Sequence, residues 1–147
     1  MKIKLKKFKI VKSTNDIAIK LIKKNISGPI LITTQRQTGG RGRIGKKWVS
    51  KKGNLFITLF LKLDKIKINY RQFAVLNAFL LKKLISKIVQ KKITIKWPND
   101  LLFNKHKFCG ILQEIIKYDK FSYLIIGIGL NTNVAPKNKS FKSTSLK

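Results

Sequence analysis

The sequence predicts an α+β domain in which a mixed or antiparallel sheet is covered by helices. Strand-like segments outnumber helix-like ones, and most of the strands follow one another as hairpins joined by short turns. Two segments show apolar residues at helical spacing. At 147 residues, with 44% hydrophobic residues, the chain suits a single domain with one ordinary core.

The first part of the chain alternates between strand and helix patterns. Residues 3–11 place lysines between apolar residues, as in a strand. Ser13, followed by an acid three residues later, approximates a capping box and begins a helix. Asn25 and the Ser-Gly-Pro that follows soon after end this helix. Further strands are predicted over residues 29–34 and 54–63.

A second helix is predicted to begin at Asn69, with Gln72 in the position that a capping box requires. Its apolar face is predicted from residues that recur every three to four positions. These residues are Phe73, Leu76, Leu80, Leu84 and Ile88.

The rest of the chain is predicted to consist of strands and turns. The strands cover residues 92–97, 101–103, 108–116 and 121–133. The turns are Pro-Asn-Asp, a four-residue hairpin turn over 104–107, and Tyr-Asp-Lys.

The charge is extreme, with 34 Lys and Arg residues against five Asp and Glu and a net charge of +29. Such a charge alone is typical of nucleic-acid binders. The lysines are nevertheless spread along the whole chain beside an excess of Ile and Asn, and all three residue types have A/T-rich codons. We therefore attribute much of the charge to genome composition. We expect non-specific affinity for polyanions, without a selected DNA-binding function.

Several classes of protein do not fit the sequence. The apolar runs are too short to span a bilayer, and the first ten residues do not resemble a signal peptide. The single cysteine, Cys109, excludes an internal disulfide and fits a cytoplasmic location. His106 is the only histidine, so no Cys/His cluster exists for zinc.

The segment QTGGRGRIGKKW, residues 37–48, is both flexible and basic. Backbone N–H groups freed by its glycines can surround an anion, and the guanidinium groups of Arg41 and Arg43 suit carboxylate or phosphate. The spacing matches neither a phosphate-binding P-loop nor a dinucleotide fingerprint. A solvated hairpin loop explains the pattern equally well.

The segment KWPND and the hairpin after it contain a second candidate group. Asp100 is one of only five acids, and it is either part of a structural turn or a partner for a metal ion or an amine, with Lys96 nearby. The predicted hairpin returns Lys107 to the strand that begins at Asp100. Gly110, inside a strand, indicates close approach of a ligand or of another backbone.

The segment GIGLNTN, residues 127–133, interrupts an apolar strand with Gly127 and Gly129 and ends in two asparagines, Asn131 and Asn133. The glycines again indicate that a group packs against the backbone. A bulge followed by a turn explains the pattern without a ligand.

Together, STND, QTGGRGR with its later Trp, KWPND with its later Lys and CGIL, and GIGLNTN resemble the catalytic domain of biotin–protein ligases, from about residue 8 to residue 147. The resemblance implies a fold related to class II aminoacyl-tRNA synthetases and lipoate ligases. It also implies an enzyme that uses ATP and Mg²⁺ to activate biotin as biotinyl-5′-AMP. The biotinyl group would then pass to a lysine of the biotin carboxyl carrier protein of acetyl-CoA carboxylase.

The resemblance also assigns site residues. The catalytic residues would be Lys107, Arg43 and Asp100, with Lys107 at the carboxylate of biotin and Asp100 receiving the proton of the incoming lysine. Biotin would contact Ser13, Thr14, Asn15, Gln37, Gly40, Arg41, Gly42, Arg43, Lys107 and Gly110. ATP and the adenylate would contact Arg41, Arg43, Trp48, Asn99, Lys107, Gly129 and Asn131. No metal ligand is assigned among the side chains, and the glycine-rich loop would be a lid, poorly ordered when empty.

Two departures from the family are expected to matter. Ile44 and Lys46 stand where the family often has arginines, so the adenylate would be held less firmly. We expect a single catalytic domain over residues 1–147, without the N-terminal DNA-binding domain and the C-terminal β-barrel domain of other members. A repressor role is therefore not expected.

Alternative functions remain open at this stage. They are a lipoate–protein ligase of the same superfamily and a non-catalytic basic protein that binds biotin or nucleic acid. A nucleic-acid binder would interleave aromatic and basic residues, whereas most phenylalanines here fall at core spacing. A homodimer formed through a sheet edge is common in the family and is also left open. An acidic carrier protein would associate quickly and in a salt-sensitive manner.

Overall fold

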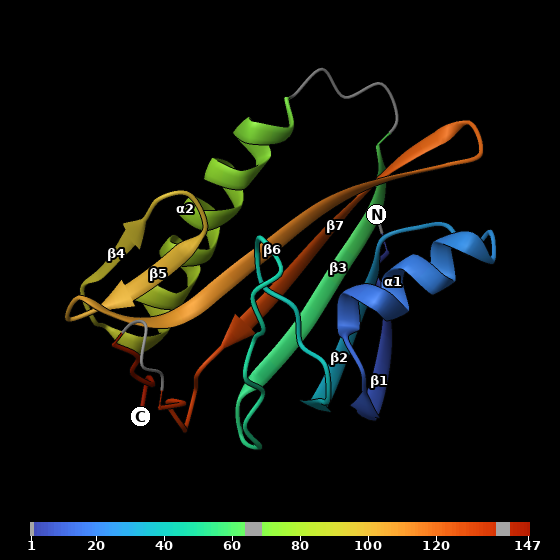
Figure 1. Cartoon of the computed structure of the whole chain (residues 1–147). Helices are drawn as coiled ribbons and strands as arrows, with labels where there is room; N and C mark the ends of the chain where they lie inside the picture. The colour runs from blue at the N-terminus through green and yellow to red at the C-terminus, as the bar shows by residue number, and fades with distance from the viewer. Residues whose placement is uncertain (1, 64–68, 138–141) are drawn as a thin grey trace.

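The computed structural model describes residues 2–63, 69–137 and 142–147. Its strands form one mixed sheet in the order β1-β2-β3-β7-β6-β5-β4, in which only the β1–β2 pair is parallel (Figure 1). The strands are β1 (Lys4–Val11), β2 (Ile30–Gln37), β3 (Leu55–Leu63), β4 (Ile93–Lys96), β5 (Asp100–Phe103), β6 (His106–Tyr118) and β7 (Phe121–Leu130). The helices are α1 (Thr14–Lys23) and α2 (Tyr70–Val89).

The two helices cover opposite faces of the sheet. Successive side chains of a strand point to opposite faces. In β7, Tyr123 and Ile125 pack in one core cluster with residues of α1, whereas Leu124 and Ile126 pack in another with residues of α2. The predicted α+β class, with a mixed sheet covered by helices, is confirmed.

Both predicted helix starts are confirmed. Ser13 caps α1, and its Oγ accepts a hydrogen bond of 3.4 Å from the backbone N–H of Asp16. At α2, the Oε1 of Gln72 accepts a hydrogen bond of 2.9 Å from the backbone N–H of Asn69. Asn25, just after α1, adopts a left-handed conformation with φ of 56°.

The predicted apolar face of α2 is wrong except at Phe73. The other four predicted members are 40% to 72% exposed; they are Leu76, Leu80, Leu84 and Ile88. The helix instead buries Ala78 and Ile85, with Leu81 partly buried beside them. Apolar side chains occur on most sides of this helix. Its sequence therefore contains two apolar stripes at helical spacing, the predicted one and the one that is buried. Ala78 lies against the sheet with almost no exposed surface, and its small side chain permits that approach.

The predicted four-residue turn over 104–107 is also wrong. Phe103 pairs with His106, so the turn contains only Asn104 and Lys105, whose φ angles are 48° and 62°. Two left-handed residues are the signature of a tight hairpin turn, and Asn is well suited to the first position. The shorter turn makes Lys107 part of β6.

The last strand ends at Leu130, three residues earlier than predicted. The side chain of Asn54 accepts hydrogen bonds from the backbone N–H groups of Asn133 and Val134, which replace sheet pairing there. The end of the chain joins the same region, because the N–H of Leu146 donates to the carbonyl of Asn131 at 3.0 Å. The other predicted strands are present, with boundaries shifted by a few residues.

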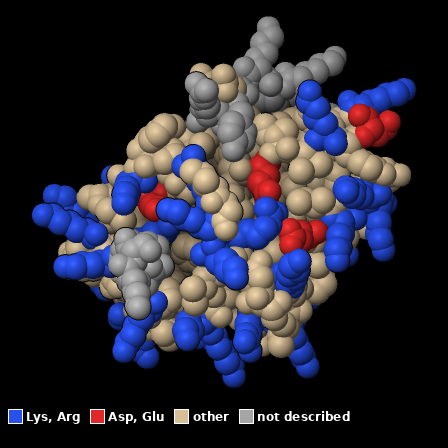
Figure 2. Space-filling model, viewed as in Figure 1, with Lys and Arg blue, Asp and Glu red and all other residues tan. Residues whose placement is uncertain are grey.

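Strand β1 is an edge strand with little cover. Half or more of the surface is exposed at Ile3, Leu5 and Ile10, which lie in or next to this strand. Lysines alternate with these apolar residues. Figure 2 shows lysine and arginine side chains at many places on the visible face and acidic groups at only a few. Charged side chains on an edge oppose pairing with another sheet. Across the described ranges, no helix is long and apolar enough to cross a membrane.

The corrected face of α2 can be tested with two neighbouring residues. We expect Ile85→Ala to lower the free energy of unfolding by about 2–5 kcal/mol, because it leaves a cavity in the core. Leu84→Ala should change it by about 0.5 kcal/mol or less, because that side chain is already 57% exposed. Urea denaturation of both variants measures the difference. A larger loss for Leu84→Ala than for Ile85→Ala would mean that the sequence-predicted face is the buried one.

Candidate active site

A strip without side chains runs across the centre of the sheet, on the face covered by α1. Gly110 of β6 is paired with Gly129 of β7, and Gly127 lies two residues before Gly129 on the same face. A Cβ atom at Gly127 would overlap the Oδ1 of Asn15, and one at Gly129 would overlap the indole of Trp48. The glycines therefore make room for these two side chains on the sheet.

A cavity of about 700 Å³ lies over this strip, beneath the glycine-rich loop. Most of the predicted site residues line it: Ser13, Thr14, Asn15, Gln37, Arg41, Gly42, Arg43, Trp48, Asn99, Asp100, Lys107, Gly110 and Gly129. Two predicted contacts, Gly40 and Asn131, are not among its lining residues. Gly40 is buried beneath the backbone of Trp48, and Asn131 is bonded to Asn54 and to the carbonyl of Thr144.

The floor of the cavity is a polar network at the first turn of α1. The Oε1 of Gln37 accepts hydrogen bonds from the backbone N–H of Thr14 at 2.8 Å and from its hydroxyl at 3.1 Å. The hydroxyl of Thr58 lies 2.7 Å from that of Thr14 and donates to the Oδ1 of Asn15 at 2.6 Å. Thr58 is fully buried, and Asn15 is only 3% exposed. Such fixed amide and hydroxyl groups suit a small, uncharged polar ligand group.

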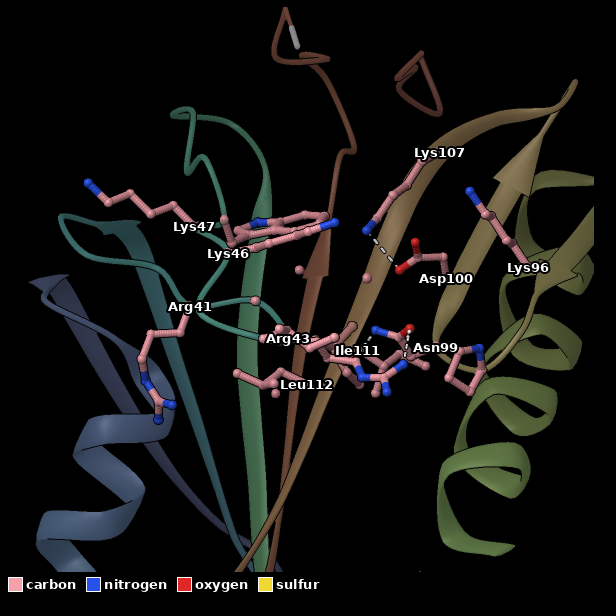
Figure 3. Close-up of a pocket in the computed structure, with 18 of the residues that line it drawn as sticks. Arg41, Arg43, Lys46, Lys47, Lys96, Asn99, Asp100, Lys107, Ile111 and Leu112 are labelled. Carbon is pink, nitrogen blue, oxygen red and sulfur yellow. Dashed lines mark hydrogen bonds and ion pairs between the residues drawn. The ribbon is translucent and has the colours of Figure 1, made fainter. Parts of the chain in front are cut away.

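An ion pair lies on the opposite side of the cavity, as Figure 3 shows. The Nζ of Lys107 is 2.7 Å from the Oδ1 of Asp100, and both side chains are about four-fifths buried. The sequence predicted this proximity, and the hairpin of β5 and β6 provides it. The Nζ of Lys107 also lies 5.4 Å from the ring centroid of Trp48. The ammonium group is therefore held between a carboxylate and an aromatic face.

The indole of Trp48 forms a wall of the cavity above Gly110 and Gly129. Its Nε1–H is buried and has no hydrogen-bond partner within the described structure. A buried donor without a partner is costly, so a ligand that accepts this hydrogen bond would gain from it.

The glycine-rich loop folds into a small hairpin over the cavity. Trp48 N–H donates to the carbonyl of Gly40 at 2.8 Å, and Gly42 N–H donates to that of Lys46 at 2.6 Å. Its tip is formed by Ile44 and Gly45, with φ angles of 53° and 69°, and Ile44 is 91% exposed. A left-handed conformation is unfavourable for a β-branched residue, so the tip is strained.

The two arginines of the loop have different partners. The guanidinium of Arg41 binds Asp16 and Glu114, and the hydrogen bonds to Glu114 raise the pKa of Arg41 above its ordinary value. Arg43 donates to the amide oxygen of Asn99 at 3.3 Å. In Figure 3, Arg41 points toward α1, whereas Arg43 lies beside Asn99. Of the two guanidinium groups, only that of Arg41 is neutralised by carboxylates in the described part of the chain.

Two other reactive residues of the sequence, Cys109 and His106, do not line the cavity. Cys109 is fully buried, and burial raises the pKa of its thiol far above the ordinary range. His106 lies at the surface turn, with Nδ1 2.6 Å from the carbonyl of Asn104. No group of three His, Cys, Asp or Glu side chains suited to a metal ion occurs in the described ranges.

Known proteins share the sequence pattern and the fold described above. The model of the biotin/lipoate A/B protein ligase family matches residues 7–131. The chain belongs to this family. Among the relatives, the bifunctional ligase/repressor BirA of Bacillus subtilis is 34% identical over 131 residues, which are 88% of this chain and 40% of that protein.

Solved structures of the family agree with this assignment. The biotin protein ligase of Aquifex aeolicus in complex with biotin and ATP superposes with a TM-score of 0.81 at 31% identity, over 97% of this chain and 59% of that one. The ligase of Leishmania major in complex with biotinyl-5-AMP also gives a TM-score of 0.81, at 27% identity, over 97% of this chain and 63% of that one. The chain thus spans less than two thirds of these relatives.

Sequence reasoning did not identify two polar residues of the site, Thr58 and Glu114. Thr58 is a threonine in the otherwise apolar LFITLFL, and Glu114 is one of only five acids, so both had a compositional signal. Their partners, Asn15 and Arg41, are more than forty residues away in sequence. Such contacts are not visible in local patterns.

The contact between Trp48 and the glycine strip gives a spectroscopic prediction. In a Trp97→Phe background, which removes the exposed second tryptophan, we expect Gly129→Ala to shift the fluorescence of Trp48 to longer wavelength. The new Cβ would displace the indole toward solvent. Gly39→Ala is the matched control, because its Cβ would meet the flexible side chain of Lys12. An unchanged emission spectrum for Gly129→Ala would contradict the packing described.

Proposed function

We propose that the chain provides the catalytic site of a biotin–protein ligase, which forms biotinyl-5′-AMP from biotin and ATP and transfers the biotinyl group to a lysine of a biotin carboxyl carrier protein. The observation that supports this most is the composition of the cavity. It combines a buried amide and hydroxyl floor with a cationic side formed by Lys107 and Arg43. Biotin has a neutral ureido ring at one end and a carboxylate at the other.

In this proposal the ureido ring binds at the first turn of α1. Ser13, Thr14, Asn15 and Gln37 line that end of the cavity and supply donors and acceptors in fixed positions. Gly110 leaves room for the indole of Trp48, which forms the wall beside which the rest of the ligand would lie. Gly40 and Gly42 allow the loop to cover the ligand.

The carboxylate of biotin then points to Lys107. In the first step, a carboxylate oxygen attacks the α-phosphorus of ATP, the bond to the β-phosphate breaks, and pyrophosphate leaves with its electron pair. Two anions approach one another, so cations near the reacting atoms lower the barrier. Lys107 is held in place by Asp100, and Arg43 extends from the loop that covers the site.

The nucleotide is assigned to the side of the cavity formed by Trp48, Asn99 and Gly129, whereas Asn131 does not line the cavity. The unpaired indole N–H of Trp48 offers a hydrogen bond to a ligand there. Mg²⁺ enters the proposal as the counter-ion of ATP. Within the described ranges, no cluster of side chains forms a metal site by itself.

In the second step, the amine of the carrier lysine attacks the acyl carbon, the bond to the phosphate oxygen breaks, and AMP leaves. The nitrogen must lose a proton, and Asp100 is the carboxylate at this end of the cavity. Lys46, Lys96 and Lys142 lie at the rim, so an acidic carrier domain would be attracted to the opening.

The adenylation step can be measured directly as biotin-dependent exchange between ATP and pyrophosphate. We expect exchange with biotin, and none with lipoate or octanoate. Lys107→Ala should reduce it by about a hundredfold or more, because it removes a preorganised cation. Lys120→Ala is the control, because it removes the same charge from the exposed turn between β6 and β7.

The outcomes separate the alternatives. Exchange with lipoate in place of biotin would assign the chain to the lipoate branch of the family. Absence of exchange with any of the three acids, from a protein that unfolds cooperatively, would contradict the proposed activity. Equal activity of Lys107→Ala and Lys120→Ala would refute the role of Lys107.

A further inference from the structure

All three nitrogens of the Arg41 guanidinium donate to carboxylates. Its NH1 and NH2 groups donate to the two oxygens of Glu114 at 2.8 and 2.9 Å, and its Nε donates to Asp16 at 2.9 Å. A bidentate pair of this kind is among the stronger and more directional polar contacts in proteins. The loop is therefore anchored at Arg41 to both α1 and β6.

Glu114 connects this anchor to the floor of the cavity. Its Oε2 also accepts a hydrogen bond of 2.7 Å from the Nδ2 of Asn15, whose Oδ1 accepts from Thr58. Asn15 and Asp16 are neighbours in the first turn of α1, and Arg41 binds Asp16 directly. The contacts thus close a ring that joins the floor, Glu114 and the loop.

The scarcity of acids makes this arrangement notable. Only five of the 147 residues are acidic, yet two of them bind the same arginine. Both are partly buried, with side-chain exposure of 29% for Asp16 and 22% for Glu114. Partial burial reduces screening by solvent, so these pairs are stronger than ordinary surface ion pairs.

We infer that Arg41 is a positioning residue that latches the glycine-rich loop over the cavity through Glu114 and Asp16, and that Glu114 couples this latch to the ligand-binding floor through Asn15. Arg41 then does not contact the reacting anion through its guanidinium, in contrast to the sequence-based expectation. Its role is to hold the loop over the cavity, and Arg43 lies two residues further along that loop. The latch itself does not depend on the proposed function. Only its expected effect on adenylation rests on that function.

Two readouts test the latch in the full chain. The first is the rate of tryptic cleavage after Lys46 and Lys47, which are exposed in the loop and present in every variant. We expect Arg41→Gln and Glu114→Gln each to raise this rate about tenfold, since local opening becomes easier. The double variant should be no faster than Arg41→Gln alone, because that substitution already removes the contact with Glu114.

The second readout is the steady-state kinetics of adenylation. A residue that positions the loop should raise the KM for biotin about tenfold and change kcat less when it is substituted. A residue that binds the reacting anion should lower kcat instead. Arg41→Lys keeps one charged contact and should recover part of the loss.

The matched control is Asp119→Asn, which removes the same charge from the exposed β6–β7 turn and should match wild type in both readouts. Arg41→Gln is a loop substitution, so it keeps the test valid if Glu114→Gln unfolds. Unchanged cleavage in Arg41→Gln, or a loss confined to kcat, would overturn the latch. Faster cleavage in a chain without adenylation activity would support the latch and contradict the proposed function.

Discussion

The bare strip at Gly110, Gly127 and Gly129 is the constraint on which the site depends. Because these three positions of the strands have no side chain of their own, Asn15 packs directly on β7 and the indole of Trp48 lies on β6 and β7. Asn15 fixes the floor through Thr58 and Glu114, and Trp48 forms a wall beside Lys107. A single methyl group on this strip would displace a side chain that several others contact. The glycines are needed for space, since none of the three adopts a positive φ.

Charge in this molecule is organised by its few acids rather than by its many bases. Asp100 binds Lys107, and Asp16 and Glu114 bind Arg41, so three of the five acids hold cations of the site. Each of these cations is held in one position. Most other lysines are exposed and attract anions without direction. A high net charge therefore says little about function here, whereas the positions of the acids indicate where the chemistry lies.

The sequence predicted most elements, because capping boxes, strand alternation and the glycine motifs are local patterns. Much of the cavity lining followed from the resemblance to biotin–protein ligases. Prediction from the sequence failed at α2, where two apolar stripes compete and only the small side chain of Ala78 shows which one meets the sheet. It also failed at the turn of Asn104 and Lys105, where pairing of Phe103 with His106 shortens the loop. The partners of Arg41 could not be predicted, because Glu114 is 73 residues away and is selected by sheet register.

The register also explains why the floor and the glycine-rich loop are linked. Glu114 lies on the same face of β6 as Gly110, four residues away, and so shares the α1 face of the sheet with the glycine strip. From that position one carboxylate reaches both Asn15 and Arg41. A residue on the other face would point to the core beneath α2 instead, as Ile111 does. A ligand that orders the first turn of α1 would therefore favour the closed loop, since both are held by the same carboxylate.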